Sequence, residues 1–287
     1  MKIAELFGRP DPVFSFEFFI PKTPGETDAF LANVRALQAL KPAFVTLTYG
    51  AGGSARERTI ELAGRMRNEV GTETVCHLTG ITHTRAEMSR NLERLRALGI
   101  SHVVALRGDR PKDWDGELPG DFPYALQLVE FIRRAGGFHM AVAGYPEGHP
   151  EAVDKSDDLA RLAAKVRCGG EWIITQLFFD NRHYFAFVDA ARRAGITVPI
   201  VPGLMPVTGF AQLKRFTSLC GASIPPEMAA DLERIHGDGE AVVRYGIDWA
   251  TRQCRELLER GAPGIHFYTL NRSRSTAEIL SALRKLN

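Results

Sequence analysis

The 287-residue sequence lacks several features that mark whole classes of protein. It has only four cysteines, and Cys76, Cys168, Cys220 and Cys254 are scattered without a CxxC pair or a paired histidine. Such a pattern is typical of free thiols in a reducing compartment. No apolar run is long enough to span a membrane, and the N-terminus has no apolar core of a signal peptide. We therefore expect a cytoplasmic protein that engages no membrane.

The sequence also has almost no excess of one sign of charge. The net charge is +2 and basic and acidic residues are interspersed, which argues against a nucleic-acid partner. The sequence has no GxGxxG after a strand, no GxxxxGK[ST] and no GxSxG. Its histidines form no HExxH, and its carboxylates form no calcium loop. We expect no metal, and any nucleotide cofactor would have to bind through loops.

What the sequence does contain is a regular alternation of short β-rich runs and longer amphipathic segments. Eight runs predict strands, at residues 13–19, 43–49, 73–79, 102–108, 139–145, 171–178, 198–203 and 264–270. Helical patterns lie between them, for example at 27–40, 85–99 and 155–170, and the region 204–262 has room for two or three helices. This alternation predicts one (β/α)8 TIM barrel over residues 1–287, with extra helices before the last strand.

Polar residues follow nearly every predicted strand. In a TIM barrel the C-terminal strand ends meet at one mouth, where function gathers. A single polar strand end fits a turn or a helix cap equally well, but polar groups at nearly every strand end favour an active site. The residues of this ring are Glu17, Thr48, Tyr49, His77, Thr79, Arg107, Gly108, Asp109, Tyr145, Pro146, Glu147, Gln176 and the stretch 268–272.

The stretch "VFSFEFFIPKTP" at residues 13–24 places a carboxylate in an apolar strand. Burying Glu17 in ionised form costs several kcal/mol unless it is paired, so we expect its pKa to be raised. A Glu paired with an Arg is the structural alternative. Alternation predicts two faces: Phe14, Phe16 and Phe18 on one, and Val13, Ser15, Glu17 and Phe19 on the other.

These residues belong to a series of blocks that resembles the methylenetetrahydrofolate reductase family. The blocks are "FSFEFF", "VTLTYGAGG", "HLTG", "VALRGDRP", "AGYPEGHPE", "ITQLFFD", "PGLMPV" and "HFYTLNR", in the family's order over about residues 13–272. The resemblance implies a barrel holding non-covalent FAD, which NADH or NADPH reduces. The flavin then reduces 5,10-methylenetetrahydrofolate to 5-methyltetrahydrofolate. The chain resembles the short bacterial form, and whether it forms a homo-oligomer is left open.

The resemblance also implies residue roles. Glu17 would be the general acid, because a carboxylic acid kept protonated by an apolar site can protonate a folate nitrogen. Asp109 would stabilise the cationic iminium left by ring opening and tune the flavin. Substrate contacts would come from Glu17, Asp109, Gln176, Gln212, Phe216 and Arg272. FAD contacts would come from Thr48, Tyr49, Ala51, His77, Arg107, Gly108, Asp109, Tyr124, Ala125, Tyr145, His149, Asp158, Arg161 and Lys165.

Two positions depart from the family pattern. Relatives usually have Asn where this chain has Arg161, and the longer, positively charged Arg side chain could reach a phosphate of the cofactor. Ile20 stands where a Pro commonly follows "FEFF". Two other readings remain open: another FAD-dependent barrel, such as a proline dehydrogenase, and a non-catalytic barrel that binds folate or a partner protein.

Overall fold

A computed structural model describes residues 2–49, 53–110, 116 and 119–284 of the chain. Its centre is a sheet of parallel strands in the order β7-β6-β5-β4-β3-β2-β1-β9-β8. Each of the eight predicted runs contains a strand, so the predicted TIM-barrel architecture is confirmed. The strands are β1 (Val13–Phe18), β2 (Phe44–Leu47), β3 (Thr74–Thr79), β4 (His102–Leu106), β5 (His139–Gly144), β6 (Gly170–Thr175), β7 (Ile200–Val201), β8 (Gly203–Leu204) and β9 (Gly264–Tyr268).

The predicted strand at 198–203 is divided in two and closes the barrel. Strand β7 pairs with β6, whereas β8 pairs with β9 on the other side. Pro202 separates β7 from β8 because proline has no N–H to give to a ladder. Its carbonyl still accepts a hydrogen bond of 2.9 Å from the backbone N of His266. The segment therefore joins the two edges of the sheet.

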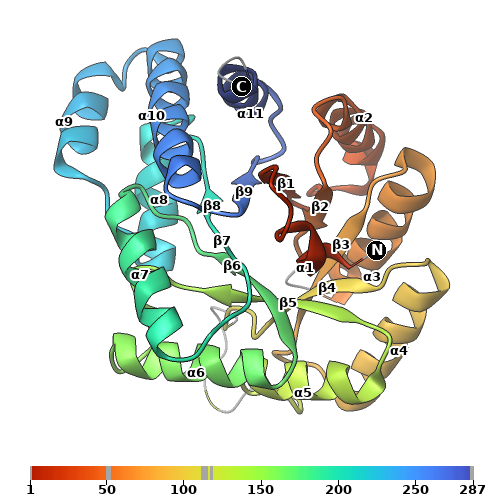
Figure 1. Cartoon of the computed structure of the whole chain (residues 1–287). Coiled ribbons are helices and arrows are strands. Elements are labelled where there is room, and N and C mark those ends of the chain that lie inside the picture. Colours follow the sequence, from red (N-terminus) through yellow and green to blue (C-terminus); the bar gives the residue numbers. More distant parts are fainter. Residues whose placement is uncertain (1, 50–52, 111–115, 117–118, 285–287) are drawn as a thin grey trace.

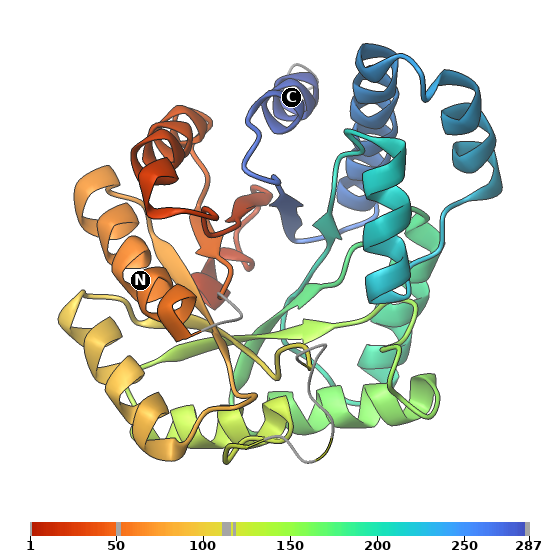
Figure 2. The same cartoon turned by 180° about the vertical axis from the view of Figure 1, so that it is seen from behind.

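Helices surround the strands as a ring in chain order (Figures 1 and 2). Three helices, α8, α9 and α10, precede β9, which confirms the prediction for 204–262. A 3₁₀ turn at Pro24–Glu26 and a π-helical turn at Met66–Val70 complete the regular structure. The helices are α1 (Ile3–Leu6), α2 (Thr27–Gln38), α3 (Gly53–Arg65), α4 (Arg85–Ala97), α5 (Ala125–Ala135), α6 (Lys155–Arg167), α7 (Asn181–Arg193), α8 (Phe210–Cys220), α9 (Pro226–Ile235), α10 (Gly239–Glu259) and α11 (Arg274–Arg284).

Strand β1 has the two faces that its alternation predicts. Phe16 and Phe18 are fully buried in the core between strands and helices. Val13 instead belongs to a second core inside the barrel, where α1 and Trp172 pack at the N-terminal end of the strands. Apolar packing thus fills that end of the barrel, and the polar residues of β1 lie toward the other end.

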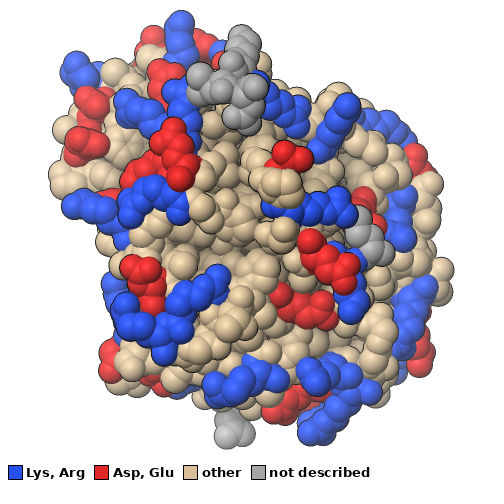
Figure 3. Space-filling model, viewed as in Figure 1, with Lys and Arg blue, Asp and Glu red and all other residues tan. Residues whose placement is uncertain are grey.

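The distribution of surface charges and the state of the cysteines match what the sequence indicates. On the face shown in Figure 3, basic and acidic side chains are interspersed. All four cysteines are free. Among the described residues, no helix combines the length and apolar character that a membrane crossing requires.

Candidate active site

Glu17 lies inside the barrel near the C-terminal end of β1, and its partners come from three strands. Its Oε2 accepts a hydrogen bond of 3.2 Å from the hydroxyl of Thr46, its register partner on β2. His266 Nε2 on β9 lies 3.4 Å from the same oxygen, and His77 Nε2 on β3 lies 3.3 Å from it. The Glu17 side chain is only 8% exposed. A buried carboxylate therefore faces two imidazoles.

This geometry corrects the expectation of an apolar environment and a raised pKa for Glu17. Burial does raise the pKa of the carboxyl, but the charge of His77 and the hydrogen bond from His266 outweigh it and lower the pKa to about 2. Neither imidazole is near Glu17 in the chain, so the spacing of residues could not reveal this pairing. The alternative of a Glu–Arg pair is also wrong, since the partners are histidines.

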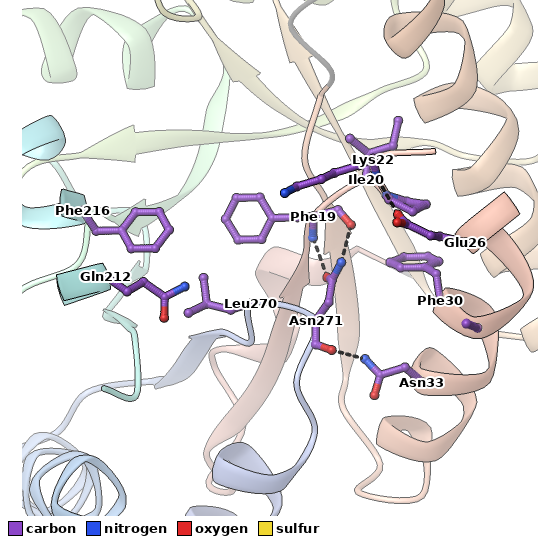
Figure 4. Close-up of a pocket in the computed structure, with 12 residues that line it drawn as sticks. Phe19, Ile20, Lys22, Glu26, Phe30, Asn33, Gln212, Phe216, Leu270 and Asn271 are labelled. Atoms are coloured by element: carbon purple, nitrogen blue, oxygen red, sulfur yellow. Dashed lines mark hydrogen bonds between the residues drawn. The ribbon is translucent and has the colours of Figure 1, made fainter. Parts of the chain in front are cut away.

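A pocket of about 580 Å³ opens just beyond the end of β1. Figure 4 shows Phe216 and Gln212 of α8 on one side, facing Phe19 and Leu270 on the other. Phe19 follows Glu17 by two residues, so the pocket begins beyond the strand end that holds the carboxylate, although Glu17 itself does not line it. Its walls are mostly apolar, with a few polar groups: Lys22, Glu26, Asn33, Gln212 and Asn271. Such a pocket suits a flat, partly apolar ligand.

Asn271 holds the wall of this pocket together. Its Oδ1 accepts a 2.8 Å hydrogen bond from the backbone N of Phe19, and its Nδ2 donates one of 2.8 Å to the carbonyl of Phe19. Leu270 and Asn271 have left-handed backbones, with φ of 51° and 57°. Non-glycine residues adopt this conformation at a cost, and functional sites are where such strain gathers. The clamp fixes β1 just beyond Glu17.

A second group of predicted residues gathers at the ends of β5 and α6. The Lys165 ammonium, half-buried, donates a 2.9 Å hydrogen bond to the carbonyl of Ala143. Burial lowers its pKa to about 8, and Asp158 opposes that shift. Asp158 Oδ2 accepts a 3.2 Å hydrogen bond from the backbone N of His149, and burial raises the pKa of Asp158. The rings of His149 and Tyr145 are in edge contact at 4.6 Å.

The remaining cations of the predicted cofactor site already have partners. Arg107 forms a two-pronged pair with Glu151, at 2.6 Å for the Nη2–Oε1 contact. Arg161 pairs with Asp157 at 2.9 Å, and its guanidinium lies 5.7 Å from the centre of the Tyr124 ring. A phosphate would have to replace these carboxylates.

The structure places the other predicted residues along the same mouth. Thr48 accepts a 3.3 Å hydrogen bond from the backbone N of Ile20. The Tyr49 hydroxyl lies 3.3 Å from His83 Nε2, and burial raises the pKa of Tyr49. Ala51 lies outside the described residues. Gly108 has φ of 90°, and Asp109, Tyr124 and Arg272 are exposed. Ala125 is the first residue of α5. The side-chain oxygen of Gln176 accepts a hydrogen bond from the backbone N of Leu177, and that of Gln212 accepts one from the hydroxyl of Thr208.

Sequence reasoning missed two residues that contact Glu17: Thr46 and His266. Alternation along "GIHFYTL" carries a signal, because it puts His266 and Tyr268 on one face of their strand. Nothing in the sequence states which residues face each other across the barrel. The register of β1 against β9, which opposes Ser15 to His266, supplies that information.

The fold and the site together define a class. The chain is a TIM-barrel protein with its titratable and amide side chains gathered at the C-terminal mouth. Solved structures with the same fold include a Clostridium thermocellum protein described as binding two copies of 5-methyl-5,6,7,8-tetrahydrofolic acid (TM-score 0.65, 14% identity, 98% of this chain and 97% of that one). A dihydropteroate synthase from Xanthomonas albilineans has a TM-score of 0.53 at 13% identity and covers 96% of this chain and 93% of that one. At these identities the likeness shows the fold alone.

Sequence comparison identifies the family. Residues 2–284 match the family model of methylenetetrahydrofolate reductase, and the chain belongs to this family. It is 37% identical to the 5,10-methylenetetrahydrofolate reductase of Escherichia coli K12, over 98% of this chain and 93% of the relative. It is 40% identical to methylenetetrahydrofolate reductase (NADH) 1 of Zea mays, again over 98% of this chain. The chain spans about half the length of the plant relatives it matches.

Proposed function

We propose that the protein reduces 5,10-methylenetetrahydrofolate to 5-methyltetrahydrofolate with NADH or NADPH, and that it uses FAD. The observation that carries this proposal is a buried carboxylate, Glu17, at the floor of the mouth beside a mostly apolar pocket, in a chain of this family. We place the activity in the cytoplasm, since the four free thiols suit a reducing compartment.

The residues at the mouth fit a bound FAD. His77 Nε2 is buried and has no well-aligned hydrogen-bond partner among the described residues, so it can engage a ligand atom. His149 Nδ1 accepts a 3.0 Å hydrogen bond from the backbone N of Glu151, which leaves Nε2 to carry the proton and donate. Lys165, whose charge burial disfavours, gains from a nearby anion. FAD, when bound, supplies hydride transfer between the nicotinamide and the folate.

The chain's own residues have separate tasks in this proposal. Glu17 passes a proton to the folate nitrogen whose bond to carbon breaks, and ring opening leaves a cationic iminium. Asp109 places its negative charge near that cation. Phe216 and Phe19 hold the flat substrates between them, and Gln176 offers its amide to the pterin. Arg272, exposed at the rim, meets the carboxylates of the glutamate tail.

Replacing Lys165 by Met is expected to weaken FAD binding by roughly 10–100-fold at pH 7, because it removes one charge-assisted contact to the pyrophosphate. The pH dependence has a definite sign. Lys165 is charged below its pKa of about 8 and loses its charge above it. FAD affinity should therefore be constant below pH 8 and fall by up to about tenfold per unit above it. Titration of flavin fluorescence between pH 6 and 9.5 measures both effects.

The Lys165→Met variant should lose this alkaline decline along with its affinity. Arg167→Met is a matched control, since Arg167 is an exposed cation in the last turn of the same helix. It should bind FAD as the parent does. Parent-like FAD affinity in Lys165→Met would place the pyrophosphate elsewhere.

An Asp109→Asn variant is expected to slow folate reduction by roughly 10²-fold, the low end for one electrostatic contact to a developing charge, because Asp109 is exposed. It should also raise the flavin midpoint potential, since a negative neighbour of the reduced flavin is lost. Asp189→Asn, at an exposed position of α7, is the control. Unchanged turnover together with an unchanged potential would remove Asp109 from the site.

Product analysis tests the proposed function. Protein loaded with FAD should oxidise NADH or NADPH only when methylenetetrahydrofolate is present, and chromatography should find 5-methyltetrahydrofolate in equal amount. Proline should not reduce the flavin. Reduction by proline would favour the proline dehydrogenase reading, and folate binding without turnover would favour a non-catalytic barrel.

A further inference from the structure

His266 is the most deeply buried titratable side chain in contact with Glu17, and the mechanism above gives it no task. It is fully buried on β9, and its ring stacks on Phe44 with centroids 6.2 Å apart and planes 17° apart. Its Nδ1 lies 2.8 Å from the hydroxyl of Ser15, which is also fully buried. Its Nε2 lies 3.4 Å from Glu17 Oε2. Both ring nitrogens are therefore engaged.

The sheet register builds this chain of contacts. Ser15 opposes His266 in the pairing of β1 with β9, and Glu17 follows Ser15 on the same face of β1. Ser15, His266 and Glu17 are consequently joined in one line across two adjacent strands. A serine hydroxyl can accept a hydrogen bond from a protonated Nδ1. Nδ1 keeps its hydrogen whether or not Nε2 carries a proton, so Ser15 holds the imidazole in the tautomer that releases its proton from Nε2.

Glu17 needs a positive neighbour when it is ionised, because a buried carboxylate is costly without one. The titratable groups that face it are His77 from β3 and His266 and Tyr268 from β9, while β2 contributes the neutral Thr46. Tyr268 cannot become a cation, so only an imidazole can supply the counter-charge. The charge of His77 has the larger effect on the Glu17 pKa, but His77 Nε2 makes no hydrogen bond within the described residues, whereas His266 Nε2 hydrogen-bonds to Glu17.

We propose that His266, held by Ser15, stores the proton that Glu17 delivers to the folate; this inference rests on the proposed function. When a substrate covers the mouth and excludes water, the ion pair becomes less favourable than the neutral pair. The Nε2–H bond of the imidazolium then breaks and an O–H bond forms at Glu17 Oε2. That O–H bond breaks in turn as the folate nitrogen takes the proton and its C–N bond opens. Imidazole and carboxylate remain, and water restores the proton when the mouth opens.

His266→Gln separates proton storage from orientation. The Gln amide can still donate a hydrogen bond to Glu17 but cannot release a proton. We expect flavin reduction by NADH to stay near the parent rate in this variant. The folate half-reaction should slow by at least about tenfold at pH 8 and by less at pH 6, because Glu17 must then take its proton from solution. Ser15→Ala should shift the pH profile in the same direction by a smaller amount, and it gives a second variant if His266→Gln does not fold.

A second readout does not depend on turnover. Calorimetric binding of 5-methyltetrahydrofolate in buffers of different ionisation enthalpy counts the protons taken up. The parent should take up close to none, because the proton moves within the pair, whereas His266→Gln should take up to one. His139→Gln is a matched control, since His139 pairs with Glu171 at 2.9 Å at the N-terminal end of the barrel. It should behave as the parent in both measurements.

The outcomes distinguish a failure of the proposed function from a failure of proton storage by His266 alone. If Glu17→Gln leaves the folate half-reaction intact, the proposed function of Glu17 fails and the storage role fails with it. If Glu17→Gln is slow but His266→Gln keeps the parent's pH profile and proton count, the storage role alone is wrong. A loss in His266→Gln that is equal at every pH, with no change in proton uptake, would also overturn it and leave a purely structural histidine.

Discussion

A Glu17→Gln variant is expected to reduce its bound flavin with NADH at near the parent rate but to lose roughly 10²–10⁴-fold in reoxidation by methylenetetrahydrofolate, the usual contribution of general acid catalysis. The two half-reactions differ because hydride transfer to the flavin needs stacking and orientation but no proton from residue 17. Opening the folate ring needs an acid, and an amide cannot supply one. Gln is nearly isosteric with Glu and can still accept the hydrogen bond from Thr46.

Stopped-flow absorbance of the flavin follows each half-reaction separately. Glu171→Gln is the matched control, because it alters a different Glu–His pair, which is half-buried and lies at the opposite end of the barrel. That variant should keep both rates near the parent values. Equal losses in both half-reactions of Glu17→Gln would mean that Glu17 is structural, and no loss in the folate half would mean that another group is the acid.

Trp172→Ala is expected to lower the free energy of unfolding by about 3–5 kcal/mol, the usual cost of truncating a fully buried aromatic residue. Trp172 is fully buried inside the barrel near its N-terminal end, 6.5 Å from the Phe44 ring and 6.2 Å from the His102 ring. The protein side chains around it can only partly close the cavity, because strands on every side hold the barrel open.

Trp172→Phe is the matched comparison. The Trp172 indole N–H has no hydrogen-bond partner within the described part of the chain, so phenylalanine removes an unpaired donor along with some volume. We expect it to cost no more than about 1.5 kcal/mol. Urea unfolding of both variants measures the difference, provided that the slope of free energy against urea is unchanged. A decrease of less than about 1 kcal/mol in the free energy of unfolding of Trp172→Ala would show that packing at this end of the barrel contributes little to stability.

The architecture was predictable because its signals are local. Alternation in "VFSFEFF" predicted that Ser15 and Glu17 share one face of β1, opposite Phe16 and Phe18, and repeated strand–helix units predicted the barrel. The division of the strand at 198–203 also has a local cause, since Pro202 cannot donate to a ladder.

The environment of Glu17 was not predictable, because it depends on register. His77 and His266 lie 60 and 249 residues from Glu17 in the chain, and only barrel closure brings them to one oxygen. The expectation of a raised pKa for Glu17 was wrong for the same reason. It rested on the apolar residues next to Glu17 in the sequence and not on the histidines across the barrel. The pairing of Arg161 with Asp157, by contrast, follows from i, i+4 spacing on one helix.

Anaerobic absorbance of the purified protein with FAD is the decisive measurement of the proposed activity, because one cuvette follows the cofactor through both substrates. We expect a yellow protein whose flavin band is bleached by NADH or NADPH and restored by methylenetetrahydrofolate, with one equivalent of 5-methyltetrahydrofolate formed. A colourless protein that does not bind added FAD, or a bleached flavin that methylenetetrahydrofolate leaves reduced, would contradict it.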